Sequence, residues 1–157
     1  MGTPTTDTVP RGSGVWFARP ATAEAGSITV SGSINATSKT HDIAAGFNMI
    51  SSAFPTDMAL NNGPIDWVAC GAVAGAAPAT ADQIQVWDGS KFTAYFYRAY
   101  KATNPNKFTL GPAWVSVDAL GTPTTDTISA GKGFWYARPS TSAAGTLVET
   151  SPLAVKE

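Results

Sequence analysis

An internal duplication constrains this chain more than any other feature, because one end of the sequence repeats the other without a gap. Three stretches match in order and at one constant spacing: residues 2–8 with 121–127, 15–20 with 134–139, and 26–30 with 145–149. Self-similarity of this kind marks a repeated supersecondary unit. We treat residues 1–34 (the first copy) and 121–153 (the second copy) as two copies of one element within a single β domain, residues 1–157.

Each copy predicts a turn, a strand, a loop and a second strand. Gly-Thr-Pro favours a turn, and Gly-x-Gly gives backbone freedom just before the aromatic residues. Side chains alternate between the two faces of a strand, so Phe17 and Arg19 share one face and Trp16 lies on the other. Proline ends each of these strands, since it cannot donate to the ladder. Six residues on the two predicted strands are therefore candidates for assembly or binding: Trp16, Phe17, Arg19, Trp135, Tyr136 and Arg138.

An extra hairpin needs a sheet to join, and the sequence leaves two places open. The two copies can complete one sandwich or barrel inside the chain. Alternatively, the hairpin of residues 1–34 can complete the sheet of a neighbouring molecule by strand addition, giving a head-to-tail filament or layer. Either way, we expect both ends of the chain to be held in sheets or interfaces.

The middle of the chain predicts further short strands with turns between them. Residues 47–51 and 113–117 are strand-like, and residues 83–87 and 92–97 flank Asp-Gly, a strong hairpin signal. Helix is indicated only weakly, over residues 56–62. The sequence therefore predicts an all-β, antiparallel sandwich or barrel with a duplicated terminal hairpin and minimal helix.

The charge of the chain bears on its partners. Charged residues make up 13% of the sequence and the net charge is −1, with no basic run. Nucleic acid is excluded as a partner because phosphate binding needs clustered Lys and Arg. Membrane insertion is excluded because the apolar runs are too short. The matched positions of Asp7 with Arg19, and of Asp126 with Arg138, predict one ion pair in each copy.

The residues that carry enzyme chemistry are scarce. His41 is the only histidine and Cys70 the only cysteine, which gives no metal-ligand spacing and only one possible base for a thiol nucleophile. We therefore expect a chain that is not an enzyme, with no catalytic residue, no metal and no cofactor.

Aromatic residues around the predicted hairpin open a second functional hypothesis. Exposed rings stack on sugars, and Trp87, Tyr95 and Tyr97 are candidates for such a platform, together with Phe92 and Tyr100. Strand alternation places Tyr95 and Tyr97 on one face, and at least one face must be core.

Three further stretches resemble a known family. They are GFNMIS followed by FP (residues 46–55), VWDGSKF (residues 86–92) and ISAGKGFW (residues 128–135). In this order they resemble the "GWNLIGNPYP … IWDG … GxGFW" segments of secreted surface proteins of Bacteroidetes and Verrucomicrobia. Phe47 replaces the usual Trp, and the Asn-Pro before the aromatic is absent. The resemblance implies an exported β-sandwich-like module with no catalytic residues to carry over.

Repeat, composition and resemblance together favour a non-enzymatic extracellular or cell-surface structural module that self-associates through its β-hairpins. Its expected partner is itself, as a homo-oligomer, filament or layer. The alternative is a carbohydrate-binding or adhesive module whose exposed aromatics bind surface glycans.

Overall fold

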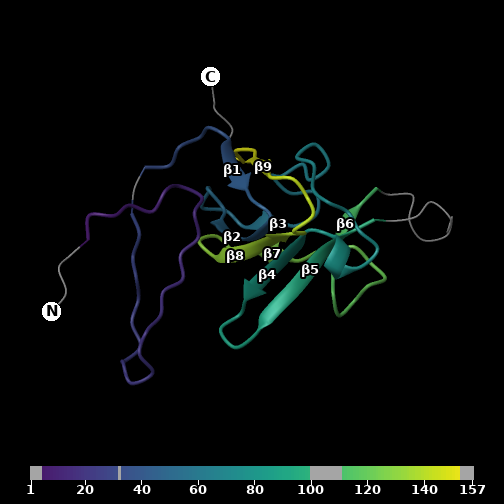
Figure 1. Cartoon of the computed structure of the whole chain (residues 1–157). Coiled ribbons are helices and arrows are strands. Elements are labelled where there is room, and N and C mark those ends of the chain that lie inside the picture. The colour runs from purple at the N-terminus through teal and green to yellow at the C-terminus, as the bar shows by residue number, and fades with distance from the viewer. Residues whose placement is uncertain (1–4, 32, 100–110, 153–157) are drawn as a thin grey trace.

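The structure, a computed structural model, describes residues 5–31, 33–99 and 111–152. The described chain is all-β, as predicted (Figure 1). A single short 3-10 turn, η1, covers Pro78–Thr80. The strands are β1 (Lys39–Ile43), β2 (Gly46–Ser51), β3 (Met58–Ala59), β4 (Gln83–Trp87), β5 (Phe92–Arg98), β6 (Ala113–Ser116), β7 (Thr127–Ile128), β8 (Gly133–Arg138) and β9 (Gly145–Glu149). We call the part of the chain from β1 to β6 the body, and the second copy adds β7, β8 and β9 to it.

The body and the second copy together form one large and two small antiparallel sheets. The large sheet has the order β2-β8-β4-β5-β6, and the small ones are β1-β9 and β3-β7. Because β2 and β6 end the large sheet, it is open, so the structure is sandwich-like and not a barrel. The second copy supplies β7, β8 and β9, one strand to each sheet, and β8 lies between β2 and β4.

The core lies between the large sheet and the two small ones. The small sheets contribute side chains from all four of their strands to the same buried cluster as the large sheet. These are Ile43, Met58, Ile128 and Leu147, which meet Ile50, Ile84, Tyr95, Tyr97, Trp114, Phe134 and Tyr136 of the large sheet. Burial of aromatic and aliphatic side chains of this size stabilises by about 1.5–3 kcal/mol each. Each of the three strands of the second copy therefore carries part of this core.

The central hairpin is confirmed. β4 and β5 pair with Trp87 opposite Phe92, and Gly89 takes the turn with φ 111°. The Asp88 carboxylate accepts hydrogen bonds from the backbone N–H of Ser90 (2.7 Å) and of Lys91 (2.9 Å). These donors, that of Lys91 foremost, lower the pKa of Asp88 to about 2.

The helix predicted over residues 56–62 is absent and this prediction is wrong. The segment forms β3, whose Met58 pairs with Ile128 of β7. Asn61 then fixes the following turn, since its side chain donates to the carbonyls of Trp114 (2.9 Å) and Thr124 (2.9 Å). These two bonds join the turn to backbone 53 and 63 residues further along the chain.

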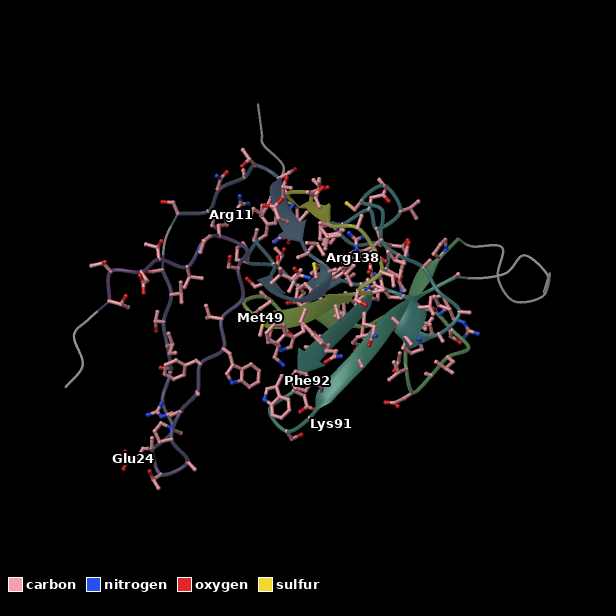
Figure 2. All side chains as sticks on the ribbon, in the orientation of Figure 1. Arg11, Glu24, Met49, Lys91, Phe92 and Arg138 are labelled. Atoms are coloured by element: carbon pink, nitrogen blue, oxygen red, sulfur yellow. The ribbon has the colours of Figure 1, made fainter. Side chains whose placement is uncertain are left out.

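The first copy departs most from expectation. Its described residues form no strand. Residues 12–14 contact β2, and the chain after them runs away from the body and back as an extended excursion (Figure 1). Glu24 lies at the far end of this excursion (Figure 2). A single bridge, Ser13 with Ile50, joins the described part of the first copy to the large sheet. The described part of the first copy thus lies in no sheet of its own chain, and the alternative in which the two copies complete one sandwich is wrong. Pairing of the first copy with a neighbouring molecule stays a prediction. Residues 1–4, 32 and 153 of the two copies lie outside the described residues.

Candidate interaction surface

Matched residues of the two copies have opposite environments. Phe17 is 66% exposed, whereas Tyr136 at the same repeat position is 0% exposed. Val30 is 91% exposed, whereas its counterpart Glu149 is 1% exposed. Near-identical sequence therefore gives a buried central strand in one copy and an exposed segment in the other.

A buried carboxylate holds β8 in the body. Asp82 lies just before β4 and is fully buried. Its Oδ2 accepts hydrogen bonds from the Tyr136 hydroxyl and from the Val73 N–H, and its Oδ1 lies 3.5 Å from Nε of Arg138. Arg138 also donates to the Gly71 carbonyl at 2.7 Å. Burial is the largest cause that raises the pKa of Tyr136, and the neighbouring Asp82 raises it further. The Tyr136 hydroxyl therefore stays protonated and donates.

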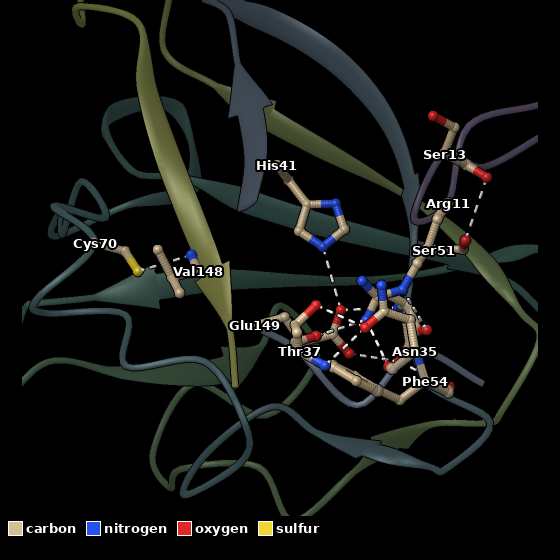
Figure 3. Close-up of polar contacts among 12 residues, drawn as sticks. Arg11, Ser13, Asn35, Thr37, His41, Ser51, Phe54, Cys70, Val148 and Glu149 are labelled. Carbon is tan, nitrogen blue, oxygen red and sulfur yellow. Dashed lines mark hydrogen bonds and ion pairs between the residues drawn. The ribbon is translucent and has the colours of Figure 1, made fainter. Parts of the chain in front are cut away.

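A second buried carboxylate holds β9. Glu149 lies 3.2 Å from Nε2 of His41 on β1, and it accepts hydrogen bonds from the Ser52 hydroxyl and from the Ala53 N–H at 2.9 Å. Figure 3 shows His41 and Glu149 facing each other across this cluster. Burial acts to raise the pKa of Glu149, but the hydrogen bonds from His41, Ser52 and Ala53 outweigh it and hold the pKa below its ordinary value.

The first copy has the same local geometry as the second, although it has no sheet around it. The Ala23 N–H donates to the Pro20 carbonyl at 2.9 Å, and the Ser142 N–H donates to the Pro139 carbonyl at 2.9 Å. Both turns occupy the same repeat position. The upstream turn is repeated too, since Ser13 N–H to Pro10 and Lys132 N–H to Ser129 are each 3.0 Å.

Two further features of this geometry recur. Gly12 has φ 82° and Gly131 has φ 77°, in the left-handed region that favours glycine. The Arg19 guanidinium lies against Gly26, as the Arg138 guanidinium lies against Gly145. The first copy therefore shares these turns, this glycine conformation and this contact with the second copy, which supplies β7, β8 and β9.

The first copy contacts the body at the outer edge of β2. Gly14 N–H donates to the Met49 carbonyl at 3.3 Å, and Ser51 N–H donates to the Gly12 carbonyl at 3.0 Å. Arg11 anchors the chain just before this bridge, with its guanidinium 4.8 Å from the centre of the Phe54 ring (Figure 3). β2 thus lies between parts of both copies, β8 on one side and residues 12–14 on the other.

Aromatic side chains gather on the outer face of the large sheet. Trp16 of the first copy lies 5.9 Å from Trp87 and 6.3 Å from Phe92, measured between ring centroids, at the end of the β4–β5 hairpin. Phe47 of β2 meets Trp135 of β8 at 6.0 Å on the same face. Trp16, Phe47 and Phe92 are exposed and the other two are half-buried. This aromatic surface, together with the apolar side chains of the first copy, is the strongest candidate for an interaction.

The sequence-based candidates separate into exposed and buried residues. Trp16, Phe17 and Arg19 are exposed, and Trp87 and Trp135 are half-buried. The others, Tyr95, Tyr97, Tyr136 and Arg138, lie in the interior, so these four are not surface-binding residues. They are buried because they project toward the two small sheets. Tyr100 lies outside the described residues.

The two predicted ion pairs are wrong. Arg138 pairs with Asp82 and not with Asp126, whose carboxylate accepts a hydrogen bond from the Tyr95 hydroxyl at 2.8 Å. Within the described ranges the structure has no ion pair between Asp7 and Arg19. Repeat position alone cannot locate such partners, since Asp82 comes from the middle of the chain.

The sequence reasoning missed the buried cluster of His41, Ser52 and Glu149. Its arrangement differs from a nucleophile–base set, because the carboxylate lies between the serine and the histidine and contacts both. The one available signal in the sequence was a difference between the copies, because the first copy has Val30 at the repeat position where the second copy has Glu149. In the part of the chain that the structure describes, no group of three or more His, Cys, Asp and Glu side chains is placed to hold a metal ion.

The described residues include no helix with the length and apolar character needed to cross a bilayer. Comparison of the chain with family models, with curated proteins and with solved structures gives no match.

Proposed function

We propose that this chain is a non-enzymatic structural module that works outside the cell or at its surface and associates with modules of its own fold, copies of itself included. The resulting assembly is a homo-oligomer, filament or layer. The resemblance to secreted bacterial surface modules supports the location. The low charge, net −1, supports close packing of copies, because like charges repel little.

The observation that carries this proposal is the exposed first copy. It brings Val15, Trp16, Phe17, Ile28 and Val30 to the surface, each at least half exposed. Exposed apolar side chains grouped in this way mark interaction sites in soluble proteins. Aromatic residues are also those that dominate binding energy at interfaces.

Mass measurement by light scattering during gel filtration tests the proposal. We expect the native chain to gain mass as its concentration rises, and Trp16→Ser with Phe17→Ser to shift this gain to concentrations roughly tenfold higher or more. Glu24→Gln, at the tip of the same segment, is the matched control and should behave as the native chain. A native chain that stays monomeric at every concentration, or a double variant that associates like it, contradicts the proposal.

A carbohydrate-binding function is the second candidate, favoured by the cluster of Trp16, Trp87 and Phe92 at the end of the hairpin. A sugar ring stacks on an aromatic side chain only where a face of the aromatic ring is exposed. Phe92 and Trp16 are both exposed. A glycan array with the native chain and with Phe92→Ala tests this. Binding that Phe92→Ala weakens supports the candidate, whereas an empty array removes it. Tyr95→Ala is no test, because Tyr95 is buried.

A further inference from the structure

The first copy has the conformation of a bound element without the body that binds it. Its two turns, its left-handed glycine and its Arg19–Gly26 contact repeat those of the second copy. A segment already held in its bound conformation loses less entropy on binding, which raises its affinity. The structure therefore indicates which site this segment fits: the place beside β1, β2, β3 and β4 that β7, β8 and β9 take.

Identical chains cannot fill that place for every first copy. Each chain carries two copies of the element and one body, so exchange between identical chains always leaves one copy over. Binding of a first copy lowers the free energy only where the first copy meets a body in which this place is open. The acceptor is thus a further body of this fold.

Val30 shows how that acceptor differs from this chain. In the second copy, Glu149 at the same position pairs with His41 at 3.2 Å and accepts from Ser52 and Ala53. Val30 in that place leaves the buried His41 without its partner. An unpaired polar group in the interior destabilises a fold. A valine there fits a body with an apolar side chain at the position of His41.

Arg19 and Phe17 show what the acceptor shares with this chain. Arg138 pairs with Asp82, and Arg19 has the same place and the same contact with glycine. A buried guanidinium needs a carboxylate. Phe17 lacks the hydroxyl that Tyr136 donates to Asp82. The acceptor therefore keeps an acidic residue where this chain has Asp82, and that residue has no hydroxyl partner on the inserted strand.

We infer that the first copy is the closing element of a second, related module of this fold, one with an acidic residue in the place of Asp82 and an apolar residue in the place of His41. This inference rests on the proposed association between modules. It adds that the preferred partner is a related body and not an identical one. The first copy would then take the place in that body that β7, β8 and β9 take in this chain.

The full-length chain can be turned into a stand-in for that acceptor. His41→Leu puts an apolar side chain where the residue in the place of Glu149 meets β1, and it removes the partner of Glu149. The chain can reach, because β9 ends at Glu149 opposite Lys39 and residues 31–38 would link Val30 to Lys39 as a hairpin loop. A loop of that length costs little to close. The first copy of the same or of another molecule can then enter the body.

Hydrogen exchange read by mass spectrometry measures the outcome. In His41→Leu we expect peptides within residues 13–31 to exchange roughly tenfold more slowly or better than in the native chain, and peptides within 134–149 to exchange faster. In the native chain, peptides within residues 134–149 should stay protected even at concentrations where it self-associates. Faster exchange there, together with protection of residues 15–30, would show that an identical body accepts the first copy, and would overturn the inference.

A second variant decides the question if His41→Leu does not fold. Val30→Glu changes only an exposed residue, and it gives the first copy the carboxylate that pairs with His41. We expect it to gain protection over residues 13–31, while the control Thr29→Glu, on the opposite face of the segment, gains none. Unchanged exchange in Val30→Glu, or equal gains in both variants, would overturn the inference. This result does not depend on self-association in gel filtration, because the first copy can replace the second copy within one molecule.

Discussion

At the scale of single residues, two buried carboxylates distinguish the copy of the repeat that lies in the sheets from the copy that does not. Asp82 and Glu149 are both almost completely buried, and each is paired with a basic side chain and further donors. A buried charge is tolerated only when it is paired and hydrogen-bonded. The second copy supplies Arg138, Tyr136 and Glu149 to these two clusters, whereas the first copy can supply only the arginine. Small differences between the copies thus have large consequences.

Glu149 should make stability depend on acid. Its pKa in the folded protein is held below the ordinary value, so it stabilises the fold above the pKa of the unfolded chain, and this contribution is lost as the pH falls through the folded pKa. We expect Glu149→Gln to cost roughly 1–3 kcal/mol at neutral pH and to flatten the loss of stability below pH 4.5 or so. Urea unfolding at several pH values measures both effects. Glu24→Gln, on an exposed residue, should leave the curve unchanged, and an equally steep acid loss in Glu149→Gln would contradict the assignment.

The repeat offers a matched pair of arginine substitutions. Arg138→Ala leaves the Asp82 carboxylate buried without its cation, and should lower the free energy of unfolding by about 3–5 kcal/mol. Arg19→Ala removes the same side chain from the same local geometry but from an exposed segment, and should change it by less than about 0.5 kcal/mol. Thermal or urea denaturation of the two variants compares them directly. Similar losses in both would mean that the first copy is packed in solution.

At the scale of elements, β8 shows that strand formation depends on neighbours more than on local sequence. Residues 15–19 and 134–138 share their pattern of aromatics, alanine and arginine. Only the second stretch is a strand, because it has β2 on one side and β4 on the other. β-propensity reflects packing on a sheet and is weak without one.

Hydrogen exchange of the native chain should show this contrast. The amides of residues 134–138 in β8, a strand that pairs with both β2 and β4, should exchange slowly, near the limit set by global unfolding. The amides of residues 15–19 should exchange within seconds to minutes, since they have no ladder. Equal protection in the two stretches at low concentration would show that the first copy occupies a sheet within its own chain.

At the scale of the whole molecule, an open sandwich with a low charge and exposed aromatics should associate through apolar contacts. Such association is insensitive to moderate salt, unlike association by surface ion pairs, and sulfate strengthens it. We expect the mass measured by light scattering to change little between low and physiological NaCl and to rise with ammonium sulfate. Dissociation by NaCl alone would point to charge pairs, and would contradict an apolar contact through the first copy.

The sequence by itself determined the fold class, the duplication and the central hairpin. These depend on local patterns: alternation of apolar side chains, Asp-Gly at the turn, and glycine and proline at the ends of strands. The β4–β5 hairpin and β6 appear where those patterns placed them. Composition likewise set the low charge, which no tertiary contact can alter.

The tertiary structure alone decided which copy of the repeat is a strand, which aromatics are exposed and which carboxylates are paired. Asp82 meets Arg138, Glu149 meets His41, and Tyr95 turns into the core, each through a partner far away in the chain. Two nearly identical segments cannot be told apart by propensity. The body has one place for them, and the segment that satisfies its buried charges takes it.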